Sequence, residues 1–174
     1  MKKIAEFEKV SFNQFLTTMG NIFNNCSDEK IKEIYGNIKL PERATRGSAG
    51  YDFFAPFDIE LSPGETITVP TGIRAKIATG WLLSCYPRSG LGFKYRLQLD
   101  NTVGIIDSDY YLSDNEGHIL AKITNNSLEG KTLSVKCGEG FMQGIFLEFG
   151  ITIDDDCKGV RNGGFGSTTR RDKN

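Results

Sequence analysis

Short runs of alternating apolar and polar residues begin after residue 40 and continue to residue 147. The clearest runs are 59–61, 67–69, 73–77, 81–83, 119–123, 133–135 and 144–147. They are rich in β-branched residues, and turn segments such as 62–65 (Ser-Pro-Gly-Glu) separate them. Successive short strands without intervening helices are typical of sandwich, barrel or jelly-roll folds. The pattern therefore predicts an all-β fold of this class.

The first part of the chain follows a different pattern. Residues 4–10 alternate loosely and predict one strand. Ser11 and Gln14 have the spacing of a capping box and precede apolar residues at helical intervals. Ser27, followed by two acidic residues, marks a second helix start, and Gly36 is its expected end. We expect two short helices within an insertion spanning 11–36, with their apolar faces covering a sheet.

Length and charge narrow the class of protein. A chain of 174 residues suits a single domain, which we place at 1–168, with a flexible C-terminal arm at 161–174. The 22 acidic and 21 basic residues nearly cancel, so the sequence has no electrostatic footprint of a nucleic-acid binder. No apolar run approaches the ~18 residues of a membrane span, and no signal peptide opens the chain. We expect a cytoplasmic protein that binds neither nucleic acid nor membrane.

Cysteine and histidine limit the chemistry further. The four cysteines contain no CxxC pair, and His118 is the only histidine, so the common zinc sites are not expected. A Ser/His/Asp or Cys/His hydrolase would need His118 as its base. Four cysteines without a signal sequence fit a reducing compartment. The chemistry should therefore depend on carboxylates, arginines, hydroxyls and backbone amides.

Two glycine-containing segments could recognise an anion. Residues 47–52 form a small-residue turn that ends in Asp52, although alone they could simply be a turn with a solvated carboxylate. In 86–94, Arg88 and Ser89 lie beside two glycines, so a guanidinium, a hydroxyl and backbone N–H groups can converge on a phosphate. A hairpin turn with an exposed arginine explains 86–94 about as well.

Three further segments interrupt the strand pattern. Residues 101–110 carry an apolar strand directly into Asp107, Asp109 and Tyr110, a placement suited to a general base or metal ligand. A calcium loop is the alternative, but Leu112 occupies the position where an EF-hand needs glycine. Residues 138–144 bring Gln143 into an apolar strand. Residues 161–168 could be a glycine-rich linker or an arm that closes over a nucleotide.

In this order, the five segments resemble the five signature motifs of the trimeric dUTPase family, over roughly residues 38–168. Residues 87–92 (PRSGLG) and 103–110 (VGIIDSDY) carry most of the resemblance, together with 163–168 (GGFGST). It implies a β jelly-roll homotrimer with active sites shared between subunits. The implied reaction is Mg²⁺-dependent hydrolysis of dUTP to dUMP and pyrophosphate, which limits uracil incorporation into DNA and supplies dUMP for dTMP synthesis.

The resemblance also implies roles for individual residues. Asp107 would be the general base for the attacking water, and Asp52 would hold the waters of a Mg²⁺ bound mainly by the triphosphate. Tyr110 would lie under the deoxyribose and exclude a 2′-hydroxyl. The remaining roles concern phosphate, uracil and the closing arm: phosphate contacts by Arg88, Ser89, Gly90 and Gln143; the uracil hairpin by Asn101, Ile105, Ile106 and Leu120; arm contacts by Arg161, Phe165, Gly166, Ser167 and Thr168.

The sequence also departs from the family pattern. Gly140 stands where the fourth motif usually has arginine, Thr169 where a glycine commonly follows, and 111–116 lengthen the third motif. Arg161 lies one residue nearer the glycines than in some members. Two alternatives stay open: a nucleotide-responsive regulatory protein of the phage type, with 111–116 and the N-terminal helices as its surfaces, and a dCTP deaminase of the same fold. The deaminase would need a glutamate base that 107–110 do not supply.

Overall fold

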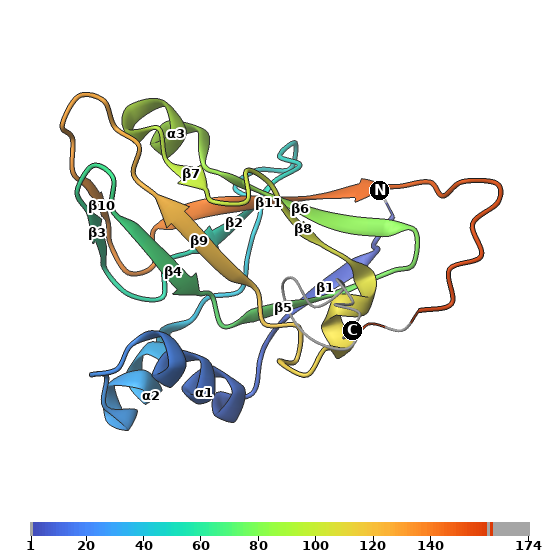
Figure 1. Cartoon of the computed structure of the whole chain (residues 1–174), viewed down its shortest axis with the longest axis horizontal. Coiled ribbons are helices and arrows are strands. Elements are labelled where there is room, and N and C mark those ends of the chain that lie inside the picture. The colour runs from blue at the N-terminus through green and yellow to red at the C-terminus, as the bar shows by residue number, and fades with distance from the viewer. Residues whose placement is uncertain (1, 160, 162–174) are drawn as a thin grey trace, which may run out of the picture.

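The computed structural model describes residues 2–159 and 161, and within them the chain is mostly β-strand (Figure 1). The strands are β1 (Ala5–Lys9), β2 (Tyr51–Phe54), β3 (Ile59–Leu61), β4 (Thr66–Pro70), β5 (Ile73–Ile77), β6 (Trp81–Pro87), β7 (Gln98–Leu99), β8 (Gly104–Ile106), β9 (Leu120–Thr124), β10 (Leu133–Val135) and β11 (Gly140–Glu148). The helices are α1 (Phe12–Ile22), α2 (Asp28–Asn37) and α3 (Ser89–Tyr95), with a 3-10 helix η1 (Ser108–Leu112). Every strand pairing recorded between these elements is antiparallel.

The largest sheet has the strand order β2-β11-β6-β8. Its long strand β11 pairs with β6 from Met142↔Pro87 to Glu148↔Trp81 and with β2 around Gln143↔Asp52. Smaller sheets β4-β9-β7, β1-β5 and β10-β3 complete the architecture. This arrangement confirms the all-β, jelly-roll-like fold expected from the alternating pattern.

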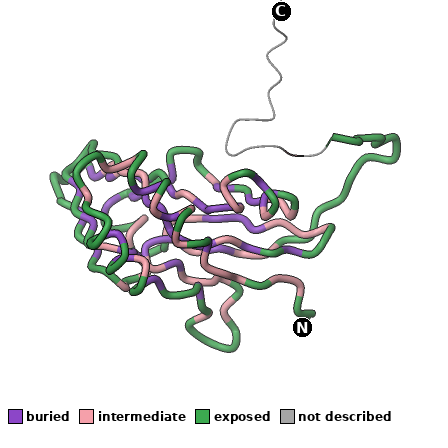
Figure 2. Tube along the Cα trace, turned by 90° about the horizontal axis from the view of Figure 1, so that it is seen from below, coloured by how far each residue is buried: buried purple, intermediate pink, exposed green. Residues whose placement is uncertain are grey.

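A continuous apolar core lies between the sheets, where buried segments run through the middle of the trace (Figure 2). Its largest fully buried side chains include Phe53, Leu83, Ile123, Leu133 and Phe141. Strands with a buried, exposed, buried pattern, such as β3 and β10, supply alternate residues to this core, as the period of two requires.

The two N-terminal helices form as expected and lie together beside β4 (Figure 1). The Ser11 hydroxyl accepts the Gln14 N–H at 3.1 Å, which is one half of the predicted capping box. The other half is supplied from elsewhere, because the Ser11 N–H is bound by Glu116 rather than by Gln14. Gly36 does not end the second helix, since α2 continues to Asn37.

Helix α3 begins within 86–94, where a hairpin turn was one of the two alternatives left open by the sequence. Its seven residues follow Arg88, which has an extended backbone, and its C-cap is Arg96, which adopts the left-handed conformation with φ 50°. Among the described residues no helix is long and apolar enough to cross a membrane. The last described stretch, 148–159, is exposed throughout, and most of the predicted C-terminal arm lies outside the described residues.

Candidate active site

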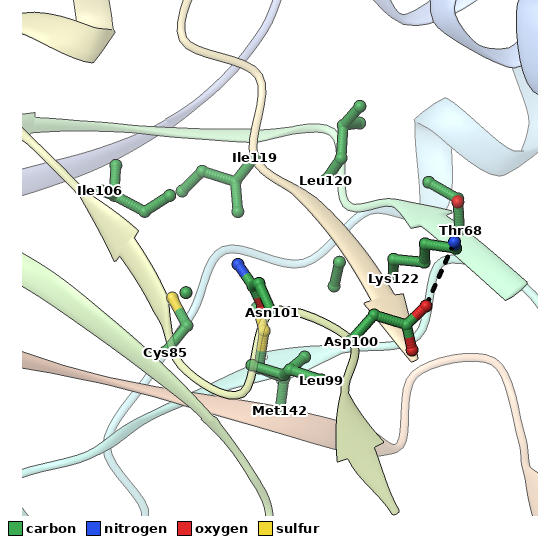
Figure 3. A pocket seen from close by; sticks show the side chains of 12 residues that line it. Thr68, Cys85, Leu99, Asp100, Asn101, Ile106, Ile119, Leu120, Lys122 and Met142 are labelled. Carbon is green, nitrogen blue, oxygen red and sulfur yellow. Dashed lines mark ion pairs between the residues drawn. The ribbon is translucent and has the colours of Figure 1, made fainter. Parts of the chain in front are cut away.

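An apolar cavity of about 290 Å³ opens between β6, β8, β9 and β11 (Figure 3). Its lining consists of Thr68, Cys85, Leu99, Asp100, Asn101, Gly104, Ile106, Ile119, Leu120, Ala121, Lys122 and Met142. Among the labelled side chains, Asn101 lies near the centre, and the ion pair between Asp100 and Lys122, 3.2 Å long, lies at one side. The cavity is therefore suited to a flat, largely apolar group with a few polar edges. We call it the base cavity.

Three of the four residues expected around a base line this cavity. Asn101, Ile106 and Leu120 contribute to the wall, whereas the Ile105 side chain is 46% exposed and is not among the lining residues. The sequence reading missed Cys85 and Met142, which lie on neighbouring strands. Alternation gave no signal for them, because Cys85 follows the buried Ser84 and Met142 follows the buried Phe141. Burial raises the pKa of Cys85 to about 12, so its thiol is neutral and acts as part of the apolar wall.

A second, more polar cavity of about 380 Å³ lies where β2, β11 and the start of α3 meet. It is lined by Ala44, Ser48, Ala49, Gly50, Asp52, Arg88, Ser89, Gln143 and Ile145. The Arg88 Nε lies 3.3 Å from the Asp52 carboxylate, and Gln143 pairs with Asp52 across the strands. A guanidinium, a hydroxyl and an amide therefore face one space. We call it the polar cavity.

The start of α3 adds backbone donors to the polar cavity. The N–H groups of Leu91 and Gly92 both bind the Arg88 carbonyl, so the helix hydrogen bonding begins with these two residues. The N–H groups of Ser89 and Gly90 precede them in the first turn, where intrahelical partners are lacking. These two donors and the partial positive charge of the helix start favour an anion at this position.

The glycine at position 140 leaves space for the Arg88 side chain. A Cβ atom added to Gly140 would lie 2.8 Å from Arg88 Nη1 and 3.1 Å from Arg88 Cδ. The Arg88 side chain therefore occupies the space beside the glycine backbone. A larger residue at 140 would have to share that space with a guanidinium.

Acidic residues follow the edge strand β8 directly. Asp107 is the N-cap of η1, and Asp109 lies in its first turn. Arg161 contacts both: its Nη2 is 2.6 Å from Asp107 Oδ2, and its Nε is 3.2 Å from Asp109 Oδ1. The Arg161 guanidinium also lies 5.5 Å from the centre of the Tyr110 ring. Within the described part of the chain, Arg161 is thus bound to carboxylates.

Tyr110 is almost completely buried, with 1% of its surface exposed. Burial raises the pKa of its phenol, so the hydroxyl stays protonated and donates to the His118 carbonyl at 2.9 Å. The same oxygen accepts a hydrogen bond from Asn115 Nδ2 at 2.8 Å. The ring is therefore held in one orientation beside Asp107.

The two cavities open on opposite faces of the central sheet. Met142 lines the base cavity and Gln143, its neighbour in β11, lines the polar cavity. Successive side chains of a strand point to opposite faces. Asp52 is paired with Gln143 and shares its face, whereas Cys85 is paired with Gly144 and shares the face of Met142. One chain therefore presents two half-sites that face apart.

Four residues expected in the arm, Phe165, Gly166, Ser167 and Thr168, lie outside the described residues. Among the described residues, no group of three or more His, Cys, Asp or Glu side chains could hold a metal ion. Any metal at the polar cavity would thus have Asp52 as its nearby protein carboxylate.

Comparison with known proteins gives one consistent family. Residues 36–169 match the model of the dUTPase family. The chain is 41% identical to a deoxyuridine 5′-triphosphate nucleotidohydrolase of Lactococcus lactis over 134 residues, which cover 75% of this chain and 88% of the relative. It is 40% identical to the corresponding protein of Tolumonas auensis over 145 residues, which cover 79% and 91%.

Solved structures agree with the sequence relatives. A dUTPase from Streptococcus mutans is 34% identical, superposes with a TM-score of 0.61, and covers 84% of this chain and 97% of its own. A dUTPase from phage phi11 of S. aureus has a TM-score of 0.62 over 90% of this chain and 98% of its own. Its identity of 18% is evidence for a shared fold alone.

Proposed function

The chain belongs to the dUTPase family and is a dUTP hydrolase, and we propose that it cleaves dUTP to dUMP and pyrophosphate by water attack on the α-phosphate, with Mg²⁺ and with Asp107 as general base. The observation that carries this proposal is Asp107 itself, a carboxylate fixed at the end of β8 beside the buried ring of Tyr110. In a cell this reaction would keep uracil out of DNA and supply dUMP. The absence of paired cysteines supports a cytoplasmic location.

The polar cavity binds the triphosphate in this proposal. Arg88 supplies a guanidinium, Ser89 a hydroxyl and Gly90 a backbone N–H, which are the donor types that recognise phosphate oxygens. Gln143 supports them from β11. The Arg88 side chain is 44% exposed although it is paired with Asp52, so it can still donate to an incoming anion.

The residues of the polar cavity fit a Mg²⁺ ion that arrives with the nucleotide. This ion usually keeps several waters and binds through one or two carboxylates plus substrate phosphates. Asp52, 19% exposed at the cavity, would hold such waters, and no protein cage is needed. When bound, the ion neutralises charge on the triphosphate and polarises the phosphoryl oxygens. A structural Mg(II) ion is described for the phage phi11 dUTPase.

The base cavity binds uracil. Asn101 gives an amide donor and acceptor to the polar edge of the base, with support from the backbone of Ile105, Ile106 and Leu120. Cytosine has the opposite donor and acceptor pattern at N3 and at the 4-position, so buried polar groups would be left unpaired. Thymine differs by one methyl group and has to be refused by lack of space, which the apolar wall of Cys85 and Met142 can impose.

Asp107 and Tyr110 act at the sugar and the α-phosphate. Tyr110 packs under the deoxyribose, where a 2′-hydroxyl would collide with the ring. Asp107 accepts a proton from the attacking water and orients it for an in-line displacement. Most of the rate enhancement then comes from orientation and from charge stabilisation by Arg88 and its neighbours.

A homotrimer with shared active sites completes the proposal. Because the base and polar cavities face apart on one chain, a nucleotide that fills both must bridge two copies. A third copy would supply the arm, with Phe165 stacked on uracil and Gly166, Ser167 and Thr168 at the phosphates. Arg161 joins them on the phosphates in this state. Its contact with Asp107 in a single chain must therefore open when substrate binds.

A substrate panel tests the activity directly. Incubation with dUTP, dTTP, dCTP and UTP in the presence of Mg²⁺ should release pyrophosphate from dUTP at least about 100-fold faster than from the others, since each rejected group costs roughly 3 kcal/mol. Removal of Mg²⁺ with EDTA should stop turnover. Equal rates with dTTP and UTP, or ammonia release from dCTP, would contradict the proposal.

Gly140→Ala should lower kcat/KM for dUTP roughly three- to tenfold, because the added methyl group displaces the Arg88 guanidinium and weakens one charge-assisted hydrogen bond. Thermal unfolding should change little, because the displaced group is the end of a flexible side chain. Gly36→Ala is the matched control, since a methyl group there meets no atom within 4 Å. Equal kcat/KM values for the two variants would show that Arg88 is not displaced or not used.

A further inference from the structure

The N-terminal helices and the segment after Tyr110, which the sequence predicts to be insertions, are joined by hydrogen bonds across more than a hundred residues of sequence. Glu116 accepts the Ser11 N–H at 2.7 Å with one carboxylate oxygen and the Ser11 hydroxyl at 2.6 Å with the other. Ser11 is the N-cap of α1, and its hydroxyl oxygen also accepts the Gln14 N–H. The first turn of α1 is therefore fastened to residue 116.

Glu116 has an unusual backbone that this contact helps to maintain. Its φ is 57°, in the left-handed region that residues other than glycine seldom adopt. Desolvation raises the pKa of Glu116, but the hydrogen bonds from Ser11 outweigh it and leave the pKa below its ordinary value. The carboxylate is therefore ionised at neutral pH and keeps both hydrogen bonds from Ser11 at the start of α1.

His118 forms the second connection between α1 and this segment. Its side chain is fully buried; Nε2 lies 2.8 Å from the Gly72 N and Nδ1 lies 3.2 Å from the Thr18 hydroxyl in α1. A backbone N–H can only donate, so Nε2 is the acceptor and the proton of the neutral ring is on Nδ1. Nδ1–H then donates to Thr18, whose own hydroxyl donates to the Gln14 carbonyl.

The same segment fixes Tyr110. Its hydroxyl donates to the His118 carbonyl, and Asn115 donates to its hydroxyl oxygen. Asn115 also accepts the N–H of Gly117 at 3.1 Å, which closes the loop around the phenol. Gly117, with φ 70°, lies against the backbone, since an added Cβ would be 2.7 Å from Tyr111 Cα. These hydrogen bonds and the close backbone approach at Gly117 connect the loop tightly to the phenol. A shift of residue 116 or 118 would therefore move the ring of Tyr110.

We propose that α1 and residues 115–118 form a brace that positions Tyr110 for sugar recognition, with Glu116 and His118 as its positioning residues. The inference rests on the proposed function, because it assigns Tyr110 to the deoxyribose. It gives the N-terminal helix α1 a role in selectivity between deoxyribose and ribose. A loosened ring leaves room for a 2′-hydroxyl and supports the deoxyribose less well.

Glu116→Ala tests the brace at a partly exposed position. We expect the ratio of kcat/KM for dUTP over UTP to fall roughly tenfold, with kcat/KM for UTP itself rising. Ser11→Ala, which removes one of the two hydrogen bonds, should give a smaller change in the same direction. General destabilisation would lower kcat/KM for both substrates together. A rise in kcat/KM for UTP therefore identifies a positioning effect.

Glu65→Ala is the matched control. The Glu65 carboxylate also accepts a backbone N–H, from Ser62 at 2.6 Å, but it lies in the turn between β3 and β4 and has no recorded contact with the brace. The ratio of kcat/KM for dUTP over UTP in Glu65→Ala should equal that of the unmodified protein. Thermal unfolding of both variants measures any loss of stability separately.

The outcomes separate this inference from the function on which it rests. If the unmodified protein does not prefer dUTP, the proposed function fails. If it prefers dUTP and Tyr110→Ala removes that preference, while Glu116→Ala and Ser11→Ala leave it unchanged, the brace is wrong and the function stands. A loss of preference in Glu116→Ala but not in Glu65→Ala supports the brace.

Discussion

Asp107→Asn is expected to lower kcat for dUTP by a factor of about 10² to 10⁴, the usual contribution of a positioned general base. Asparagine has nearly the same shape, but its amide cannot accept the proton of the attacking water. Binding of a non-hydrolysable dUTP analogue should stay within roughly threefold, because Asp107 does not contact the polar cavity that holds the phosphates. Pyrophosphate release and isothermal titration calorimetry measure the two quantities.

Asp109→Asn is the control for this substitution. Both carboxylates contact Arg161, so both variants lose one ion-pair partner of the same arginine. Asp107 lies between β8 and η1, where its carbonyl accepts the Tyr110 N–H, whereas Asp109 is 57% exposed within η1. We expect Asp109→Asn to retain most of its turnover. Equal losses in both variants would assign the effect to Arg161, and a loss of analogue binding in Asp107→Asn would contradict its role as a base.

The strands were predictable where one face is buried. The runs 73–77 and 133–135 coincide with β5 and β10, because alternation reports directly which residues face the core. β7 was missed since two residues cannot show a period. Helix α3 was missed because its sequence, SGLGFKY, contains two glycines, which disfavour a helix. Its position between β6 and β7 overrides that local preference.

The motifs predict which residues form the site, and these roles stay predictions, but the motifs do not predict the surroundings of those residues. The motif residues alone are enough to propose Asp107, Arg88 and Tyr110 as site residues. The space that Gly140 leaves for Arg88, and the bonds from Ser11 to Glu116 and from Thr18 to His118, join residues far apart in the chain. A local sequence pattern cannot predict contacts between residues so far apart in the chain. A lone histidine in particular carries no signal of the environment in which it is buried.

His118 makes the stability of the fold depend on pH. Burial lowers its pKa from 6.5 to about 4, while the nearby Glu116 carboxylate opposes the shift only weakly. Protonation of Nε2 would also place an N–H against the Gly72 N–H, so the charged ring cannot keep its hydrogen bond. The folded state therefore takes up a proton at His118 only at a much lower pH than the unfolded state does.

The direction of the effect follows from this difference. Between pH 6.5 and about 4 the unfolded chain binds a proton at His118 and the folded chain does not, so the free energy of unfolding falls as the pH is lowered. The stabilisation is fully present above pH 6.5, falls by about 1.4 kcal/mol for each pH unit, and reaches a total loss of about 3 kcal/mol near pH 4. Below that value both states carry the proton, and His118 contributes no further change.

Urea unfolding between pH 4.5 and 7.5, at one fixed protein concentration because an oligomer's stability depends on it, measures this loss. His118→Gln is the informative variant: its amide can accept the Gly72 N–H and donate to Thr18, yet it does not titrate. The variant should therefore lose the part of the pH dependence that belongs to His118, and the two curves should converge as the pH falls. Parallel curves would mean that His118 titrates alike in the folded and unfolded states, and that its burial between α1 and the Gly72 turn does not exclude the charged ring.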